Sequence, residues 1–181
     1  MKKIITVFGS ARPEEGDEEY TLAFEVGSEL AKAGFTICNG GYGGIMEASA
    51  RGAKSVGGLS IGVTCKAFHN RKANQWIDKN IETYDLTDRL MKLISLGDGY
   101  VVLRGGTGTL LELAAAWEFM NKLMIAPKPI VIVGDCWKAV ISTLQDALIA
   151  EGSHDAANLV AQVDEPKQCA VLLRQILGKK E

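Results

Sequence analysis

Short apolar runs alternate with longer amphipathic segments along most of this chain. The runs end in glycine or small polar residues and predict strands at residues 4–8, 35–38, 59–64, 100–103, 130–133 and 159–163. The segments between them have apolar residues at helical spacing and predict helices at residues 20–33, 45–55, 85–96, 110–123, 137–150 and 166–178. Strands that alternate with helices through short connections require right-handed crossovers and a parallel sheet. We therefore expect one α/β domain over residues 1–181, a Rossmann-like, doubly wound, nucleotide-binding sheet.

Residues 65–83 lack this regular pattern. The segment is polar and carries His69, Arg71, Lys72 and Trp76 without a clean period. It follows a predicted strand, and long connections at the carboxyl end of a strand are typical of lids and substrate loops. We expect a loop of that kind here.

Three of the predicted strands end in glycine or small polar residues. The first is followed by Gly9 and Ser10, the second by residues 39–44 (NGGYGG), and the fourth by residues 105–109 (GGTGT). Ligands of doubly wound sheets bind beyond the carboxyl ends of the strands, where the strand order reverses. Because three such ends can meet at one crevice, the pattern favours a nucleotide or a phosphosugar as ligand.

Residues 99–118 (GYVVLRGGTGTLLELAAAWE) form the most informative of these strand ends. A strand that breaks into glycines and continues as a helix presents backbone N–H groups and the positive end of the helix dipole. Both favour an anion, most often a phosphate. Arg104 adds a positive charge to this turn, and Thr107 and Thr109 add hydroxyl groups. We expect this turn to form the floor of the active site.

Composition and charge limit the possible partners. The formal net charge is −2, which gives no electrostatic reason to expect nucleic acid or an anionic membrane as partner. No apolar run reaches the ~20 residues of a membrane span, and the apolar run at the N-terminus is too short for a signal peptide. We expect a cytoplasmic protein. Its four scattered cysteines predict buried, reduced thiols.

Several common motifs are missing from the sequence. Neither glycine-rich turn is followed by the Gly-Lys-Ser/Thr of a Walker loop, and neither fits the GxGxxG dinucleotide pattern. His69 and His154 stand alone, so we expect no metal. No Gly-x-Ser-x-Gly elbow occurs, which leaves carboxylates and arginines as the candidate catalytic groups.

Glu112 and Arg89 each have two interpretations. Thr109 and Glu112 fit a capping box, in which Glu112 reaches back to the N-cap amide. Alternatively, Glu112 lies at the mouth of the anion site and positions water or a ribose hydroxyl. Arg89 is either a solvated arginine paired with Asp85 or a residue of the site.

The glycine-rich turns also resemble a known family. RGGTGTLLE is similar to the PGGxGTxxE signature of the LOG ("lonely guy") nucleotide phosphoribohydrolases, which are often labelled lysine decarboxylases. NGGYGGIMEASARGA resembles the family's GGGxxGLMxA segment, and VFGS resembles its first strand and turn. Arg89 stands fifteen residues before Arg104, the spacing of the family's catalytic arginine.

The resemblance implies a homodimeric hydrolase without a cofactor. Its substrate would be a nucleoside 5′-monophosphate (AMP or an N6-modified, cytokinin-type nucleotide), cleaved to free base and ribose 5-phosphate. Arg89 and Glu112 match the catalytic pair. The implied substrate- and phosphate-binding residues are Gly9, Ser10, Gly40, Gly41, Gly44, Arg104, Gly105, Gly106, Thr107, Gly108 and Thr109.

Two positions depart from the family pattern and leave other functions open. Arg104 replaces the proline of the signature, and Leu90 replaces a lysine that follows the catalytic arginine in the family. The alternative is a non-catalytic protein of the same fold that binds or carries a nucleotide or a phosphorylated cofactor. A lysine decarboxylase is disfavoured, because no lysine lies beside a glycine-rich phosphate turn to form the required Schiff base.

Overall fold

A computed structural model describes residues 2–69 and 71–178 of the chain. Its strands form one seven-stranded sheet in the order β4-β3-β2-β1-β5-β6-β7, and every neighbouring pair is parallel. The strands are β1 (Ile4–Phe8), β2 (Thr36–Asn39), β3 (Ser60–Cys65), β4 (Lys79–Thr83), β5 (Gly99–Val102), β6 (Ile130–Val133) and β7 (Val160–Val163). The predicted Rossmann-like doubly wound sheet is confirmed.

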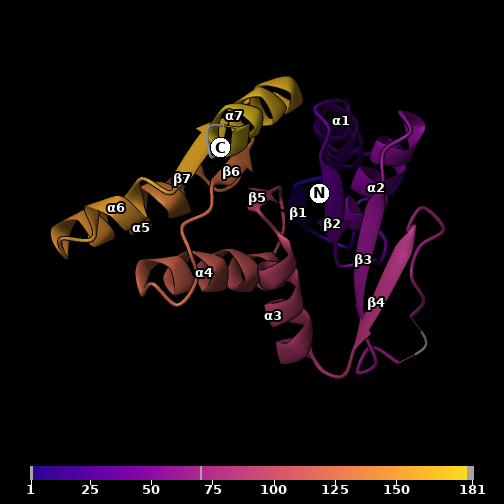
Figure 1. The fold of residues 1–181 in the computed structure, drawn as a ribbon, viewed down its shortest axis with the longest axis horizontal. Coiled ribbons are helices and arrows are strands. Elements are labelled where there is room, and N and C mark those ends of the chain that lie inside the picture. The colour runs from indigo at the N-terminus through magenta and orange to yellow at the C-terminus, as the bar shows by residue number, and fades with distance from the viewer. Residues whose placement is uncertain (1, 70, 179–181) are drawn as a thin grey trace.

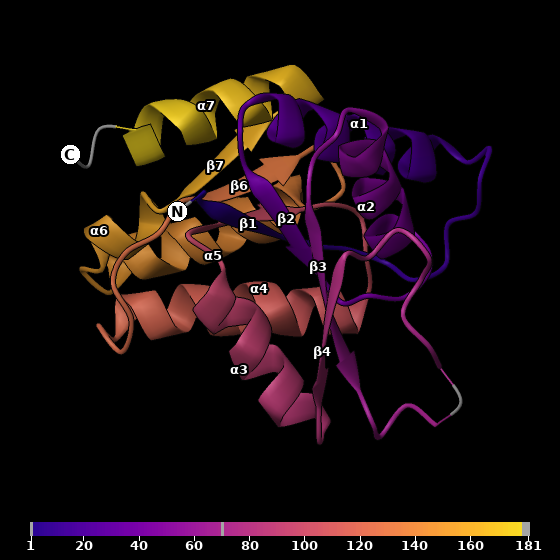
Figure 2. The same ribbon diagram turned by 45° about the vertical axis from the view of Figure 1, so that its right-hand side comes forward.

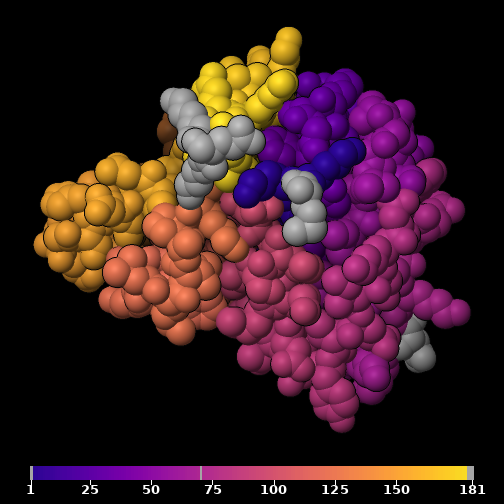
Figure 3. Space-filling model, viewed as in Figure 1, coloured from indigo at the N-terminus to yellow at the C-terminus, as the bar shows by residue number. Residues whose placement is uncertain are grey.

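Helices cover both faces of this sheet (Figures 1 and 2). The helices are α1 (Glu18–Lys32), α2 (Ile45–Ser55), α3 (Leu86–Leu96), α4 (Thr107–Asn121), α5 (Lys138–Ala150), α6 (His154–Ala157) and α7 (Pro166–Gly178). Helices α1, α2 and α7 pack on one face, while α3 and α4 pack on the other. Helices α5 and α6 project from the side of the molecule in the space-filling view (Figure 3).

The core consists of two apolar layers, one on each side of the sheet. Strands β5 and β6 are buried along their whole length, because helices cover both of their faces. This explains why these strands read as continuous apolar runs rather than as an alternating pattern. Ile5, Val7 and Val101 belong to the layer beneath α1 and α7, and Phe8 and Tyr100 belong to the layer above α4.

The strand order reverses between β1 and β5. Strands β2, β3 and β4 extend the sheet on one side of β1, whereas β5, β6 and β7 extend it on the other. Val7 pairs with Val101 and Phe8 with Val102, so β1 and β5 end side by side. The N–H of Ser10 donates to the carbonyl of Arg104 at 3.0 Å, which ties the two turns that follow these strands together.

The expectation of a loop throughout residues 65–83 is wrong in part. Its last five residues form β4, which pairs with β3 in parallel register from Ile61 opposite Lys79 to Cys65 opposite Thr83. Strand β4 is the edge of the sheet and is largely exposed, so its sequence KNIET carries few apolar residues. The sequence pattern missed the strand because an edge strand buries too little surface to require an apolar run.

Several helix boundaries also differ from the prediction. Helix α4 begins at Thr107 instead of residue 110, α1 begins two residues earlier than expected, and the short α6 was not predicted. Gly108 lies inside the first turn of α4, although glycine disfavours helix interiors. The glycines of residues 105–109 therefore concealed the true start of this helix.

Three of the four cysteines are buried as expected, and the fourth is not. Cys38, Cys65 and Cys169 are buried and free, whereas Cys136 is free but exposed. Burial raises the pKa of the Cys38 and Cys169 thiols to about 12, so both stay protonated at neutral pH. In residues 2–69 and 71–178, no helix is both long enough and apolar enough to cross a bilayer.

Candidate active site

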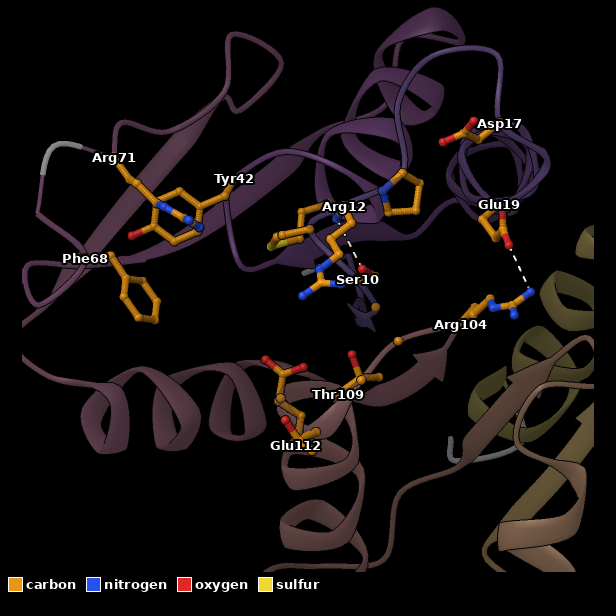
Figure 4. A pocket seen from close by; sticks show the side chains of 18 of the residues that line it. Ser10, Arg12, Asp17, Glu19, Tyr42, Phe68, Arg71, Arg104, Thr109 and Glu112 are labelled. Atoms are coloured by element: carbon orange, nitrogen blue, oxygen red, sulfur yellow. Dashed lines mark hydrogen bonds and ion pairs between the residues drawn. The ribbon is translucent and has the colours of Figure 1, made fainter.

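A cleft of about 860 Å³ opens at the carboxyl ends of β1 and β5 (Figure 4). This is the reversal point of the strand order, where doubly wound sheets bind their ligands. The cleft is lined by Gly9, Ser10, Ala11, Arg12, Pro13, Asp17, Glu19, Tyr42, Met46, Phe68, Arg71, Arg89, Arg104, Gly105, Gly106, Thr107, Gly108, Thr109 and Glu112. Four of these side chains are arginines and three are carboxylic acids. The cleft therefore favours an anion although the chain as a whole has a formal net charge of −2.

The turn between β5 and α4 forms the floor of the cleft. The N-cap of α4 is Gly106, and the first amide to bond back along the helix is that of Leu110, which donates to the Gly106 carbonyl at 3.0 Å. The amides of residues 107–109 belong to the first turn, where a helix leaves its N–H groups free. Together with the helix dipole, they provide an anion site next to Gly105 and Ser10.

The predicted capping box at Thr109 is wrong. Helix α4 already begins at Thr107, so Thr109 is its third residue and cannot be its N-cap. Thr109 is buried and packs against Gly105. Glu112 consequently lies one turn further along the helix, and its carboxylate points into the cleft instead of back to the N-cap (Figure 4).

Arg89 comes from α3 and is a buried residue of the site rather than a solvated surface arginine. Its side chain is only 9% exposed, and its Nη1 lies 3.6 Å from Oε1 of Glu112. Its Nε donates to the carbonyl of Val63 at 2.8 Å. The guanidinium carbon also lies 5.6 Å from the ring centre of Tyr42 and 5.8 Å from that of Phe68. These contacts hold the guanidinium in one place beside the carboxylate.

Helix α3 brings Arg89 to this position. Asp85 is the N-cap of this helix, and its Oδ1 accepts from the amide of Asp88 at 2.8 Å. Leu93 and Ile94 are fully buried and anchor the helix on the sheet. Arg89 lies one turn before them on the inner side of the helix, so its side chain is directed towards the cleft.

Burial changes the acidity of Glu112. Desolvation raises the pKa of its carboxyl from an ordinary value of 4.5 to about 7, and the neighbouring Arg89 guanidinium opposes this rise. The group therefore titrates near neutral pH. A carboxyl with a perturbed pKa in a cleft is a typical feature of a catalytic site.

The glycine-rich turn after β2 supports the site from behind. Gly40 lies against Arg89, and a Cβ at this position would overlap its Nη2. Gly41 packs against Thr64, and Gly44 packs against the backbone of Ser10 and Ala11. These three glycines leave room for the wall of the cleft and do not line it.

Asn39 fixes the shape of this turn. Its side chain is fully buried, donates from Nδ2 to the Met46 carbonyl at 2.8 Å and accepts at Oδ1 from the amide of Gly41 at 2.8 Å. The turn thereby directs Tyr42 and Met46 into the cleft. The structure thus brings Gly9, Ser10, Arg89, residues 104–109 and Glu112 together.

Sequence reasoning missed several residues of the cleft. Phe68 and Arg71 come from the segment before β4, and Tyr42 from the glycine-rich turn after β2. Arg12 and Glu19 come from the polar connection before α1 and its first turn. The position of each segment after the carboxyl end of a strand was visible in the sequence, but the direction of the side chains was not. Among the described residues, no group of three His, Cys, Asp or Glu side chains could hold a metal ion.

Comparison with known proteins shows the family of this chain. The model of the SLOG cluster4 family matches residues 2–170. A cytokinin riboside 5′-monophosphate phosphoribohydrolase from Mycobacterium tuberculosis is 36% identical over 135 residues, which cover 74% of this chain and 71% of the relative.

Two solved structures cover nearly the whole chain. The molybdenum cofactor carrier protein from Chlamydomonas reinhardtii has a TM-score of 0.77 and 26% identity, and the alignment covers 99% of this chain and 100% of that protein. The molybdenum cofactor binding protein from Rippkaea orientalis has a TM-score of 0.75 and 27% identity, with 98% of each chain covered. The relatives therefore include proteins named as enzymes and proteins named as cofactor carriers.

Proposed function

The chain belongs to the SLOG cluster4 family, and we propose that it is a hydrolase of nucleoside 5′-monophosphates. The substrate is AMP or an N6-modified adenine nucleotide, and the products are the free base and ribose 5-phosphate. The observation that carries the proposal is the pair of buried Arg89 and half-buried Glu112, 3.6 Å apart, beside the free amides at the start of α4. The phosphoribohydrolase name of a relative 36% identical to this chain supports the same reaction.

The first turn of α4 holds the 5′-phosphate in this proposal. Its amides and the helix dipole stabilise the negative charge, as at other helix N-termini that bind phosphate. Ser10 and Thr107 add hydroxyl groups to the same floor. With the phosphate fixed there, Glu112, which lies one turn further along α4, faces the ribose.

Cleavage of the N-glycosidic bond produces positive charge on the ribose. In an oxocarbenium-like transition state this charge is shared by C1′ and the ring oxygen, and a nearby carboxylate stabilises it. Glu112 supplies the carboxylate and orients water. The oxygen of water bonds to C1′, the bond to the base breaks, and the base leaves with a proton.

Arg89 has two functions in this reaction. Its positive charge lowers the pKa of Glu112, whereas burial raises it. Arg89 therefore keeps a fraction of the Glu112 carboxyl groups ionised. It also donates hydrogen bonds to the base or the phosphate. The rings of Tyr42 and Phe68 border this part of the cleft and offer an apolar surface to the base.

Release of free base from a panel of nucleoside monophosphates tests the proposal. We expect the wild-type protein to release adenine from AMP or an N6-modified base from its nucleotide, as measured by chromatography. Glu112→Gln keeps the shape of the side chain but removes its charge, so we expect base release to fall by about 10³-fold or more. Glu118→Gln changes an exposed carboxylate of the same helix and serves as the matched control. Full turnover by the Glu112→Gln protein would exclude this assignment.

A carrier or sensor without catalysis is the second candidate function. Two solved structures with TM-scores of 0.75 and 0.77 are named as molybdenum cofactor binding or carrier proteins, and each is more than a quarter identical to this chain. Arg104 and Leu90, which replace the proline and lysine of the phosphoribohydrolase pattern, favour the same alternative. It predicts saturable nucleotide or cofactor binding in calorimetry with no free base after long incubation. It also predicts that Glu112→Gln leaves the affinity close to that of the wild type.

A further inference from the structure

The cleft continues past the anion-binding turn, on the side away from Tyr42. We call this part the distal arm; the lining residues Asp17, Glu19 and Arg104 lie here. In Figure 4, Arg104 and Glu19 lie on one side of Thr109, whereas Phe68 and Arg71 lie on the opposite side. The first turn of α4 therefore lies near the middle of the cleft and not at its end.

The cleft is large for a small-molecule site. Its volume of about 860 Å³ lies in the upper part of the range of roughly 300–1,000 Å³ that small-molecule pockets span. A nucleoside monophosphate bound with its phosphate on the turn and its ribose beside Glu112 reaches only towards Tyr42 and Phe68. The distal arm is then left without a ligand group.

The distal arm offers groups that recognise a phosphoryl group and hydroxyl groups. Nη1 of Arg104 lies 3.0 Å from Oε1 of Glu19, and the Arg104 side chain is 67% exposed. Exposed ion pairs contribute little to stability, so Arg104 can exchange Glu19 for phosphate oxygens at small cost. The planar guanidinium binds such oxygens with two hydrogen bonds. The carboxylates of Asp17 and Glu19 accept hydrogen bonds from sugar hydroxyls.

We propose that the ligand is a nucleotide whose 5′-phosphate continues into a second phosphoryl group that carries a sugar. The inference rests on the proposed function, because the first phosphate occupies the turn of α4 and the proximal ribose faces Glu112. The second phosphate binds Arg104, and the sugar hydroxyls bind Asp17 and Glu19. The bond that breaks is the same N-glycosidic bond, but the second product is a ribose 5-diphosphate that still carries the distal sugar. Water adds to C1′ of the proximal ribose, the base leaves with a proton, and the pyrophosphate linkage stays intact.

Calorimetry on the full chain with AMP, ADP and ADP-ribose tests this proposal. We expect ADP-ribose to bind at least about tenfold more tightly than AMP, because it adds charge-assisted hydrogen bonds to an arginine. Arg104→Ala should abolish this preference, so that the two ligands bind with about equal affinity. Arg104→Pro, which introduces the residue of the LOG signature, should do the same. Arg174→Ala removes an exposed arginine of α7 far from the cleft and should keep the wild-type preference.

Two results would overturn the inference. One is equal affinity of the wild-type protein for AMP and ADP-ribose, and the other is a preference that survives in both Arg104 variants. Chromatography of the same samples separates this inference from the proposed function. Tight binding of ADP-ribose without release of adenine would support the distal arm and contradict the hydrolase. Adenine release from AMP without preference for ADP-ribose would do the opposite.

Discussion

Glu112 shows how much the environment of one side chain determines its chemistry. The carboxyl is held on the second turn of a helix, largely removed from water, and its Oε1 lies 3.6 Å from a buried guanidinium. Burial and the arginine act on its pKa in opposite directions, and burial dominates. The result is a carboxyl group that ionises near neutral pH. A small change in its surroundings can then shift it between the protonated and the ionised form.

The acidity of Glu112 predicts the pH dependence of the reaction. The proposed mechanism needs the ionised carboxylate, and the pKa of this group is raised to about 7. Base release should therefore fall as the pH drops through about 7 and reach a plateau above about pH 8. The rate constant kcat, measured from pH 5.5 to 9 at saturating substrate, checks this. A rate that rises as the pH falls would instead identify Glu112 as a proton donor.

Gly40 predicts a second effect at the residue scale. A Cβ at this position would overlap Nη2 of Arg89, so Gly40→Ala must displace the guanidinium from Glu112. A displacement of about 1 Å in an active site can reduce the rate by about 10²-fold, and we expect a loss of that size in kcat/KM. Gly43→Ala is the matched control, because the nearest atom to its new Cβ is 3.8 Å away. Equal activity of the two variants would contradict the positioning role of Gly40.

At the scale of elements, the site depends on where helices start. Helix α4 begins at Thr107 and directs Glu112 into the cleft, whereas a start at residue 110 would have turned the same carboxylate into a cap. Helix α3 begins at Leu86 and presents Arg89 from the opposite side. Two helix N-termini therefore set the spacing of the pair. Strand β4, at the edge of the sheet, holds the end of the segment that carries Phe68 and Arg71.

The cap of α3 gives a testable prediction about this arrangement. Asp85→Ala removes the acceptor for the Asp88 amide, which is 2.8 Å away. Loss of an N-cap of this kind lowers the free energy of unfolding by about 1 kcal/mol. Denaturant unfolding followed by circular dichroism measures the change. Thr87→Ala alters an exposed neighbour in the first turn of the same helix and should stay within about 0.5 kcal/mol of the wild type. An equal loss of unfolding free energy in both variants would contradict the role of Asp85 as the stabilising N-cap.

At the scale of the whole molecule, the apolar surface of α4 is shared between core and solvent. One side of α4 is buried against the sheet, and burial in the core explains the apolar residues there: Leu113, Ala116, Trp117 and Met120. Leu111 nevertheless remains 46% exposed. An exposed leucine on the helix that carries Glu112 is a candidate contact for a second copy of the chain.

We expect the protein to be a homodimer through this side of α4. Light scattering should give twice the mass of one chain. Leu111→Glu should shift the protein towards the monomer, because it places a charge in the apolar contact. Val171→Glu alters a residue of α7 that is 48% exposed, on the opposite face of the sheet, and should leave the dimer intact. A monomeric wild-type protein would exclude the proposed assembly.

Much of the fold was determined by the sequence alone. Continuous apolar runs at β5 and β6, alternating with amphipathic helices, required a parallel sheet with both faces covered. The glycine-rich ends of β1, β2 and β5 predicted a ligand crevice beyond the carboxyl ends of the strands, and β1 and β5 flank the point where the strand order reverses. These features are local, since each depends on a few neighbouring residues and on the periodicity of one element.

The tertiary structure decided the remaining features. Only the packing of α3 and α4 shows that Arg89 and Glu112, which are 23 positions apart in the sequence, lie 3.6 Å from each other. Only the packing around Arg89 shows that Gly40 supports a side chain instead of lining the cleft. Burial, acidity and side-chain direction depend on residues that are distant along the chain, so no local pattern encodes them. For this reason the glycine-rich turn after β5 was visible in the sequence, whereas the acidity of the carboxyl group beside it was not.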